Sequence, residues 1–135
     1  MSTIVIDKPK VSIAPGLLRD MQAQIHEVGQ VVVHVLFTVP VHISASYIRI
    51  WPTTYLYDQH SDHKSELVHA ENITYYPEWS QCRGGGQYFF TLVFSGLPKD
   101  CTVFDLIEQC TNQAGAFEAR SIARNNTDVY FLRMQ

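Results

Sequence analysis

Apolar side chains recur at every second position in several stretches of this chain, and this alternation limits what the chain can fold into. In the clearest stretch, 87–95, the large apolar residues at alternate positions are Tyr88, Phe90, Leu92 and Phe94. Side chains two residues apart lie on the same face of an extended strand. The alternation therefore predicts a β-strand with one buried face.

The first half of the chain also predicts strands. Residues 31–39 are almost all apolar and β-branched, which predicts a central strand covered on both faces. Residues 45–58 contain two strand segments that meet at Pro52, and we expect a bend or bulge there because proline cannot donate to a strand ladder. A polar tip at 59–64 leads into an alternating stretch at 65–73, which predicts a hairpin.

The second half of the chain adds a loop and three shorter strands. Residues 74–86 end in three consecutive glycines and are expected to form a loop. The stretch 104–108 is interpreted as a strand, although its apolar spacing also allows one helical turn. Residues 116–123 and 127–134 flank the turn-forming tripeptide Arg-Asn-Asn and predict a C-terminal hairpin.

A helix competes seriously in one segment only. Residues 16–25 place four apolar side chains on one helical face, but residues 22–28 also alternate as a strand would. Strands therefore dominate, and the expected fold class is all-β. The leading architecture is an antiparallel β-sandwich of immunoglobulin-like kind, with about seven to nine strands and at most one short helix.

Composition fits one domain spanning residues 1–135 and limits the classes of partner that the protein is expected to bind. A chain that is 46% hydrophobic and 12% aromatic can bury a core, so disorder is excluded as its main state. The net charge of −3 gives no general attraction to nucleic acid or to anionic lipid, and we expect neither nucleic acid nor membrane as a partner. The most apolar run, 31–39, is far shorter than the ~20 residues of a membrane-spanning helix. Without an apparent export signal, and with three cysteines that fit reduced thiols, a cytoplasmic location is expected. One disulfide and one free thiol is the alternative that the cysteine count leaves open.

Aromatic residues gather in the middle of the chain and form the main candidate binding site. Exposed on one sheet face, they would offer a platform for a sugar ring or a peptide. The alternative is that they pack in the core, with their polar atoms bonded outward. The candidate binding residues are Trp51, Tyr55, Tyr57, Tyr75, Tyr76 and Trp79.

Histidines at the predicted hairpin tip are the candidate metal ligands. His60, His63 and His69 lie near several carboxylates, and a hairpin can bring donors together across its two arms. Their spacing matches no established zinc signature, and the alternative is a solvated turn of mixed charge.

Catalytic signals are weaker still. Cys82 beside Arg83 is a candidate nucleophile, but an ordinary loop thiol is the simpler interpretation. The glycines at 84–86 lack the Lys-Ser/Thr of a phosphate loop and precede a predicted strand, not a helix. We therefore expect a protein that is not an enzyme, with no catalytic residue and no cofactor.

Four segments resemble a bacterial immunoglobulin-like β-sandwich module. They are residues 48–56, residues 67–73 with Pro77, residues 90–98 and residues 104–108. In modules of that kind a strand ending in Thr-x-Leu, a proline loop, a Phe-x-Leu-x-Phe-x-x-Leu-Pro strand and a Phe-Asp-Leu-Ile-Glu strand recur in this order. The resemblance covers about residues 45–108. It implies a sandwich fold and an uncharacterised, non-catalytic role.

Three hypotheses of function remain open from the sequence. The first is an interaction module that binds a protein or a carbohydrate through the aromatic face or through the loops at 58–64 and 78–87. The second is a small metal-dependent or thiol-dependent enzyme that uses the histidines or Cys82. The third is an assembly protein that forms a homo-oligomer through an edge strand.

Overall fold

The described residues of the computed structural model, 4–7, 29–111 and 116–134, form an all-β protein without a helix, as the alternation predicts. No described segment is a helix of the length and apolarity needed to cross a membrane. The strands, more than the seven to nine expected, are β1 Ile4–Asp7, β2 Gln30–Thr38, β3 Ala45–Ile48, β4 Thr54–Asp58, β5 Lys64–Glu71, β6 Ser80–Arg83, β7 Gln87–Ser95, β8 Val103–Glu108, β9 Glu118–Ala123 and β10 Val129–Met134. The helix considered for 16–25 lies outside the described residues.

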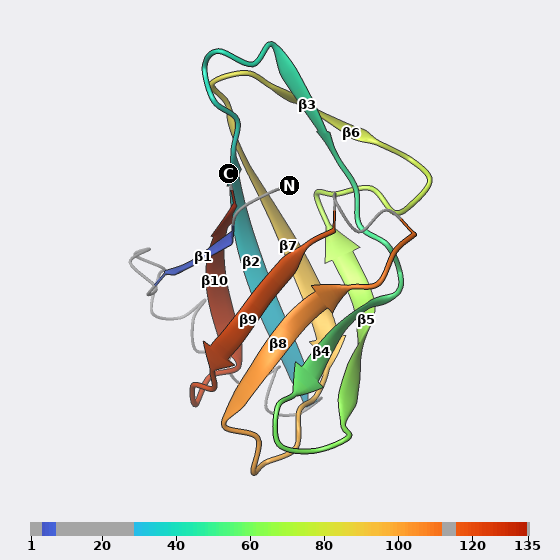
Figure 1. Ribbon diagram of the computed structural model, residues 1–135, viewed down its shortest axis with the longest axis vertical. Helices are drawn as coiled ribbons and strands as arrows, with labels where there is room; N and C mark the ends of the chain where they lie inside the picture. Colours follow the sequence, from blue (N-terminus) through green and yellow to red (C-terminus); the bar gives the residue numbers. More distant parts are fainter. Residues whose placement is uncertain (1–3, 8–28, 112–115, 135) are drawn as a thin grey trace.

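Eight of the strands form one sheet in the order β1-β10-β2-β7-β5-β4-β8-β9, and β3 and β6 form a separate ribbon. The large sheet curls, so that β4, β8 and β9 lie in front of β10, β2 and β7 (Figure 1). Ring contacts join the two halves: Phe104 meets Tyr130 edge-on with centroids 5.0 Å apart. Phe90 meets Phe117 in the same way at 5.7 Å. The core lies between these halves.

The sheet is mixed, which corrects the expectation of a purely antiparallel sandwich. Strand β10 runs parallel to β2, with Val129 opposite Val32. The predicted C-terminal hairpin is also wrong, because β9 pairs with β8 whereas β10 pairs with β1 and β2. The Asn125 side chain accepts hydrogen bonds from the backbone N–H groups of Thr127 and Asp128, and Asp128 has a φ of 55°. This turn carries the chain from one half of the sheet to the other, so its two strands never meet.

Strand β2 is central, as predicted, but only one of its faces is fully buried. Its residues alternate between buried and half-buried. The neighbouring β7 buries Phe90, Leu92 and Phe94 on the same side, while Phe89 on the opposite face is exposed. The prediction of a strand covered on both faces is therefore wrong for β2, because its outer side chains keep partial access to solvent.

The ribbon of β3 and β6 projects beyond the large sheet at one end of the molecule (Figure 1). The predicted break at Pro52 separates β3 from β4, and β4 forms the predicted hairpin with β5. The predicted loop at 74–86, however, contains β6. A glycine explains how the ribbon closes: a Cβ on Gly84 would lie 1.6 Å from the carbonyl oxygen of Ile43, so only glycine fits.

Candidate functional site

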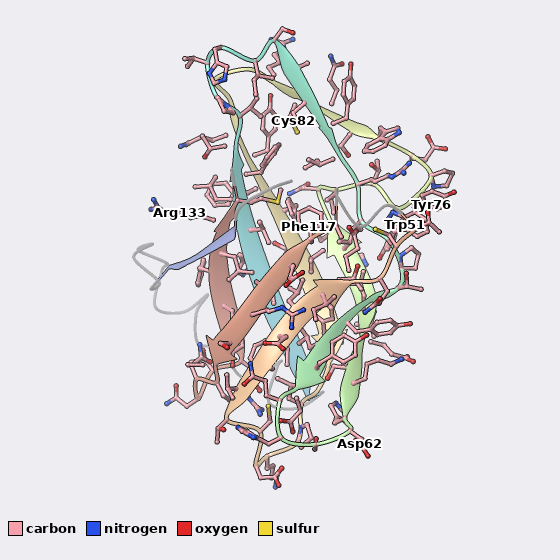
Figure 2. The ribbon with its side chains drawn as sticks, in the orientation of Figure 1. Trp51, Asp62, Tyr76, Cys82, Phe117 and Arg133 are labelled. Atoms are coloured by element: carbon pink, nitrogen blue, oxygen red, sulfur yellow. The ribbon has the colours of Figure 1, made fainter. Side chains whose placement is uncertain are left out.

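Four side chains at the base of the ribbon form the arginine–aromatic cluster, defined as Arg49, Trp51, Tyr76 and Trp79. The guanidinium carbon of Arg49 lies 3.8 Å from the ring centre of Trp79 and 4.6 Å from that of Tyr76. Tyr76 in turn stacks on Trp51 with ring centroids 3.9 Å apart, and these two residues lie together at the edge of the molecule (Figure 2). The cluster is thus a short stack of three rings and one cation.

Backbone contacts between distant segments build this stack. Ile50, between Arg49 and Trp51, forms a parallel bridge with Tyr75. The Ile50 N–H donates to the Thr74 carbonyl at 2.8 Å, and the Tyr76 N–H donates to the Ile50 carbonyl at 2.9 Å. Arg49 also donates to the Pro77 carbonyl at 3.2 Å. The chain after β3 and the loop before β6 are therefore locked together, with their aromatic residues side by side.

A buried carboxylate holds the inner side of the cluster. Glu108, at the end of β8, accepts hydrogen bonds from the backbone N–H groups of Trp51 at 2.9 Å and Phe117 at 3.1 Å. The Trp51 carbonyl accepts a hydrogen bond from the Thr54 hydroxyl at 2.7 Å, so both sides of the Trp51 backbone are fixed. Desolvation raises the pKa of Glu108, while the two N–H groups and the charge of Arg49 oppose this rise.

The outer side of the cluster faces solvent. Trp79 keeps 55% of its surface exposed and Tyr76 keeps 44%. The neighbouring Tyr75 is also exposed. Large aromatic side chains that are exposed and yet held in place are typical of binding surfaces, because little side-chain entropy is lost when a partner covers them.

The other two predicted aromatic residues form a separate pair. Tyr55 and Tyr57 lie on β4 and contact each other edge-on with centroids 6.0 Å apart. The Lys64 ammonium lies 4.2 Å from the Tyr55 ring centre, and Gln109 donates to the Tyr57 hydroxyl at 3.3 Å. Of the six predicted residues, the structure thus places three in the stacked cluster, Tyr75 next to it in the chain, and two in the pair on β4.

The three candidate metal ligands have separate partners. The Nε2 atom of His63 lies 2.9 Å from the Ser65 hydroxyl and 3.1 Å from the Gly96 carbonyl. His69 pairs with Glu71 on β5, and the backbone N–H of His60 donates to Asp58. Within the described ranges, no three His, Cys, Asp or Glu side chains are placed to hold a metal ion together. This geometry lends the metal prediction no support.

Cys82 is placed poorly for a nucleophile. It lies in β6, where its side chain is buried against the core and its position is labelled in Figure 2. Burial raises the pKa of the Cys82 thiol, which disfavours the reactive thiolate.

Sequence reasoning found the rings of the cluster but missed Arg49 and Glu108. Arg49 stands two residues before Trp51, where an alternating pattern places both side chains on one face, and this signal was available. Glu108 had no such signal, because its partners Trp51 and Phe117 come from segments that only the fold brings together.

Comparison with known proteins adds no relative: no family model, no curated protein and no solved structure matches this chain.

Proposed function

We propose that this chain is a non-enzymatic interaction module that binds a protein partner through the arginine–aromatic cluster. The observation that carries the proposal is the Arg49 guanidinium lying against Trp79 and Tyr76 while these two residues stay 55% and 44% exposed. Arginine, tryptophan and tyrosine are the residue types that contribute most binding energy at protein interfaces.

The rigidity of the cluster supports a role in recognition. Trp51 is fixed through its backbone by Glu108 and Thr54, and its ring is covered by Tyr76. A partner that covers these side chains would pay little of the usual cost, about 0.5–1.5 kcal/mol, of ordering each flexible side chain. Arg49 adds planar N–H donors for a carbonyl or carboxylate of the partner.

A protein is favoured over a carbohydrate by the way the rings are already stacked. A sugar ring packs on an open aromatic face, but Tyr76 has both Trp51 and Arg49 stacked against it. What the cluster offers instead is ring edges, one exposed indole and a guanidinium, a mixture that suits side chains and carbonyl groups of a protein.

The fold resemblance belongs to the same proposal. The two facing halves of the sheet are compatible with an immunoglobulin-like module, and such folds often serve recognition. The parallel pairing of β10 with β2 is a departure from the simple antiparallel pattern.

Capture of partners with a matched pair of variants tests the proposal. Immobilised wild-type chain, Trp79→Ala and Tyr57→Ala would be exposed to lysate from the source organism, and each captured protein would be purified and titrated calorimetrically. We expect Trp79→Ala to weaken binding about thirtyfold or more, because hot-spot truncations cost about 2 kcal/mol or more. Tyr57→Ala serves as the control, since Tyr57 lies in the separate pair on β4.

Two results would contradict the proposal. One is a captured protein whose affinity is the same for wild type and Trp79→Ala. The other is wild-type binding to immobilised glycans that Trp79→Ala loses, which would make the cluster a carbohydrate site.

A further inference from the structure

The ribbon tip, defined as the β2–β3 loop at 39–44 and the β6–β7 turn at 83–86, lies at one end of the long axis of the molecule (Figure 1). Val41 is 90% exposed and Ile43 is 38% exposed. Turn residues are usually polar, and here the two aliphatic residues lie on either side of the exposed His42.

The strands that leave the tip continue its apolar character. Tyr47 on β3 is 56% exposed and Phe89 on β7 is 58% exposed. Aromatic side chains set back from an aliphatic tip match the order found at a membrane surface, where aromatic rings lie at the level of the headgroups and aliphatic side chains reach deeper.

The backbone of the tip satisfies most of its own hydrogen bonds. This matters because an unpaired N–H group costs several kcal/mol in an apolar medium, whereas a paired one does not. Val41 is preceded by Pro40, which has no N–H to satisfy. The hydrogen bonds run from Val39 N–H to Gly86 O, from Gly85 N–H to Val39 O, from Ile43 N–H to Pro40 O, from Gly84 N–H to Ser44 O, from Gly86 N–H to Arg83 O and from Arg83 N–H to the Tyr88 hydroxyl.

Acidic residues are missing from the sequence segments that form the ribbon and its tip. No aspartate or glutamate occurs between Glu27 and Asp58, or between Glu78 and Asp100, and these stretches supply the tip and both strands of the ribbon. Arg83 stands directly beside the tip glycines. Among the described residues, the tip and the two ribbon strands carry no carboxylate side chain, and Arg83 is their one Lys or Arg residue, so the net charge of −3 of the whole chain does not describe the tip.

We infer that the ribbon tip inserts into the interfacial layer of a lipid bilayer that contains anionic headgroups. Val41 and Ile43 enter the layer between headgroups and acyl chains, and Arg83 lies among the phosphates. This surface is separate from the arginine–aromatic cluster, so the inference stands independently of the proposed function. It also revises the expectation of no membrane partner, which rested on net charge and on spanning length alone.

A bilayer needs no complementary surface for the tip to bind. Burial of the Val41 and Ile43 side chains together with attraction of Arg83 to anionic headgroups would give weak, reversible binding.

Flotation with lipid vesicles tests the inference directly. Wild type would be compared with Val41→Asp and Val41→Ser on vesicles of phosphatidylcholine alone and of phosphatidylcholine mixed with phosphatidylserine. We expect wild type to float with the mixed vesicles, less so at high salt, and Val41→Asp to lower the bound fraction at least about tenfold because a carboxylate is costly in the bilayer. Val41→Ser removes the apolar group without adding charge and should lie between the two.

Val68→Asp is the matched control, because Val68 on β5 is also an exposed valine but lies away from the tip. Thermal melting of each variant would verify that it is folded. The inference is overturned if wild type does not float with any vesicle, or if Val68→Asp reduces flotation as much as Val41→Asp. It is also overturned if, without lipid, light scattering shows a dimer that Val41→Asp dissociates, since the tip would then join two copies.

Discussion

The curled sheet and the ribbon of β3 and β6 are held by different means. In the sheet, alternate residues of long strands fill one continuous core, and many interchangeable apolar contacts fix each strand. In the ribbon, each strand of four residues buries one side chain in that core, Ile48 or Cys82. The ribbon depends otherwise on a few particular contacts: the approach of Gly84 to Ile43, the bridge from Ile50 to Tyr75, and the arginine–aromatic cluster. The stability of the sheet should therefore fall when core volume is lost, and that of the ribbon should fall when a single contact is lost.

The largest effect is expected from a core residue of the sheet. Phe94 is fully buried on β7, and Phe94→Ala should lower the free energy of unfolding by about 3–5 kcal/mol, through lost burial and the cavity left behind. Urea denaturation would measure it. Phe89→Ala on the exposed face of the same strand is the control and should cost far less. Equal losses for the two variants would contradict the assignment of the buried face.

The contrast also explains how much of the fold could be predicted from the sequence. Alternation identified β7 with its correct bounds and buried face, because it depends on one strand alone. The strands β9 and β10 were also found, but not their partners, since the side-chain contacts of Asn125 decide where the chain goes next. Pairing between distant segments leaves no periodic signal.

The candidate site was predictable to a similar degree. Aromatic side chains that lie close in sequence pointed to Trp51, Tyr76 and Trp79, which the fold does bring together. The same reasoning added Tyr55, which the bend after β3 carries to a different strand, β4. Sequence proximity thus identified the rings that form the cluster but could not separate them from Tyr55 and Tyr57, because that separation depends on which loops meet at the base of the ribbon.

The next largest effect should come from the closest approach in the ribbon. Gly84→Ala places a methyl group against the Ile43 carbonyl, which is backbone and cannot move aside without opening the tip. We expect a loss of about 1–3 kcal/mol, the usual cost of overpacking. Hydrogen exchange should show faster exchange in β3 and β6 while β2 and β7 stay protected.

Gly86→Ala is the matched control for this prediction. Its added methyl group would meet the Tyr88 ring at 2.7 Å, and a side chain can shift where a carbonyl cannot. A smaller effect is therefore expected for Gly86→Ala. If Gly84→Ala instead speeds exchange throughout the sheet, the ribbon and the sheet unfold as one unit and the contrast drawn between them is wrong.

The smallest expected effect is a difference in pH dependence between two carboxyl groups, Glu108 beneath the ribbon and Asp58 at the β4–β5 turn. Burial raises the pKa of Glu108, so the folded state binds its proton more tightly than the unfolded state does. Its contribution to stability is present at low pH and is lost as the pH rises through the folded pKa. Hydrogen bonds from the His60 N–H and the Ser61 hydroxyl lower the pKa of Asp58, so its contribution is present above the unfolded pKa and is lost as the pH falls through the folded pKa.

Replacing each carboxyl group should therefore change how steeply the free energy of unfolding falls at acidic pH, in opposite directions for the two residues. As the pH falls from about 7 to 3, a range that spans the ordinary carboxyl pKa values, Glu108→Gln should lose stability faster than wild type, because it no longer gains from taking up a proton. Asp58→Asn should lose it more slowly, because it has no favourable carboxylate to protonate. Urea denaturation at each pH gives both slopes. If both variants deviate from wild type in the same direction, the two carboxyl groups experience the same environment. That result would contradict the assignment of desolvation to Glu108 and of hydrogen bonding to Asp58.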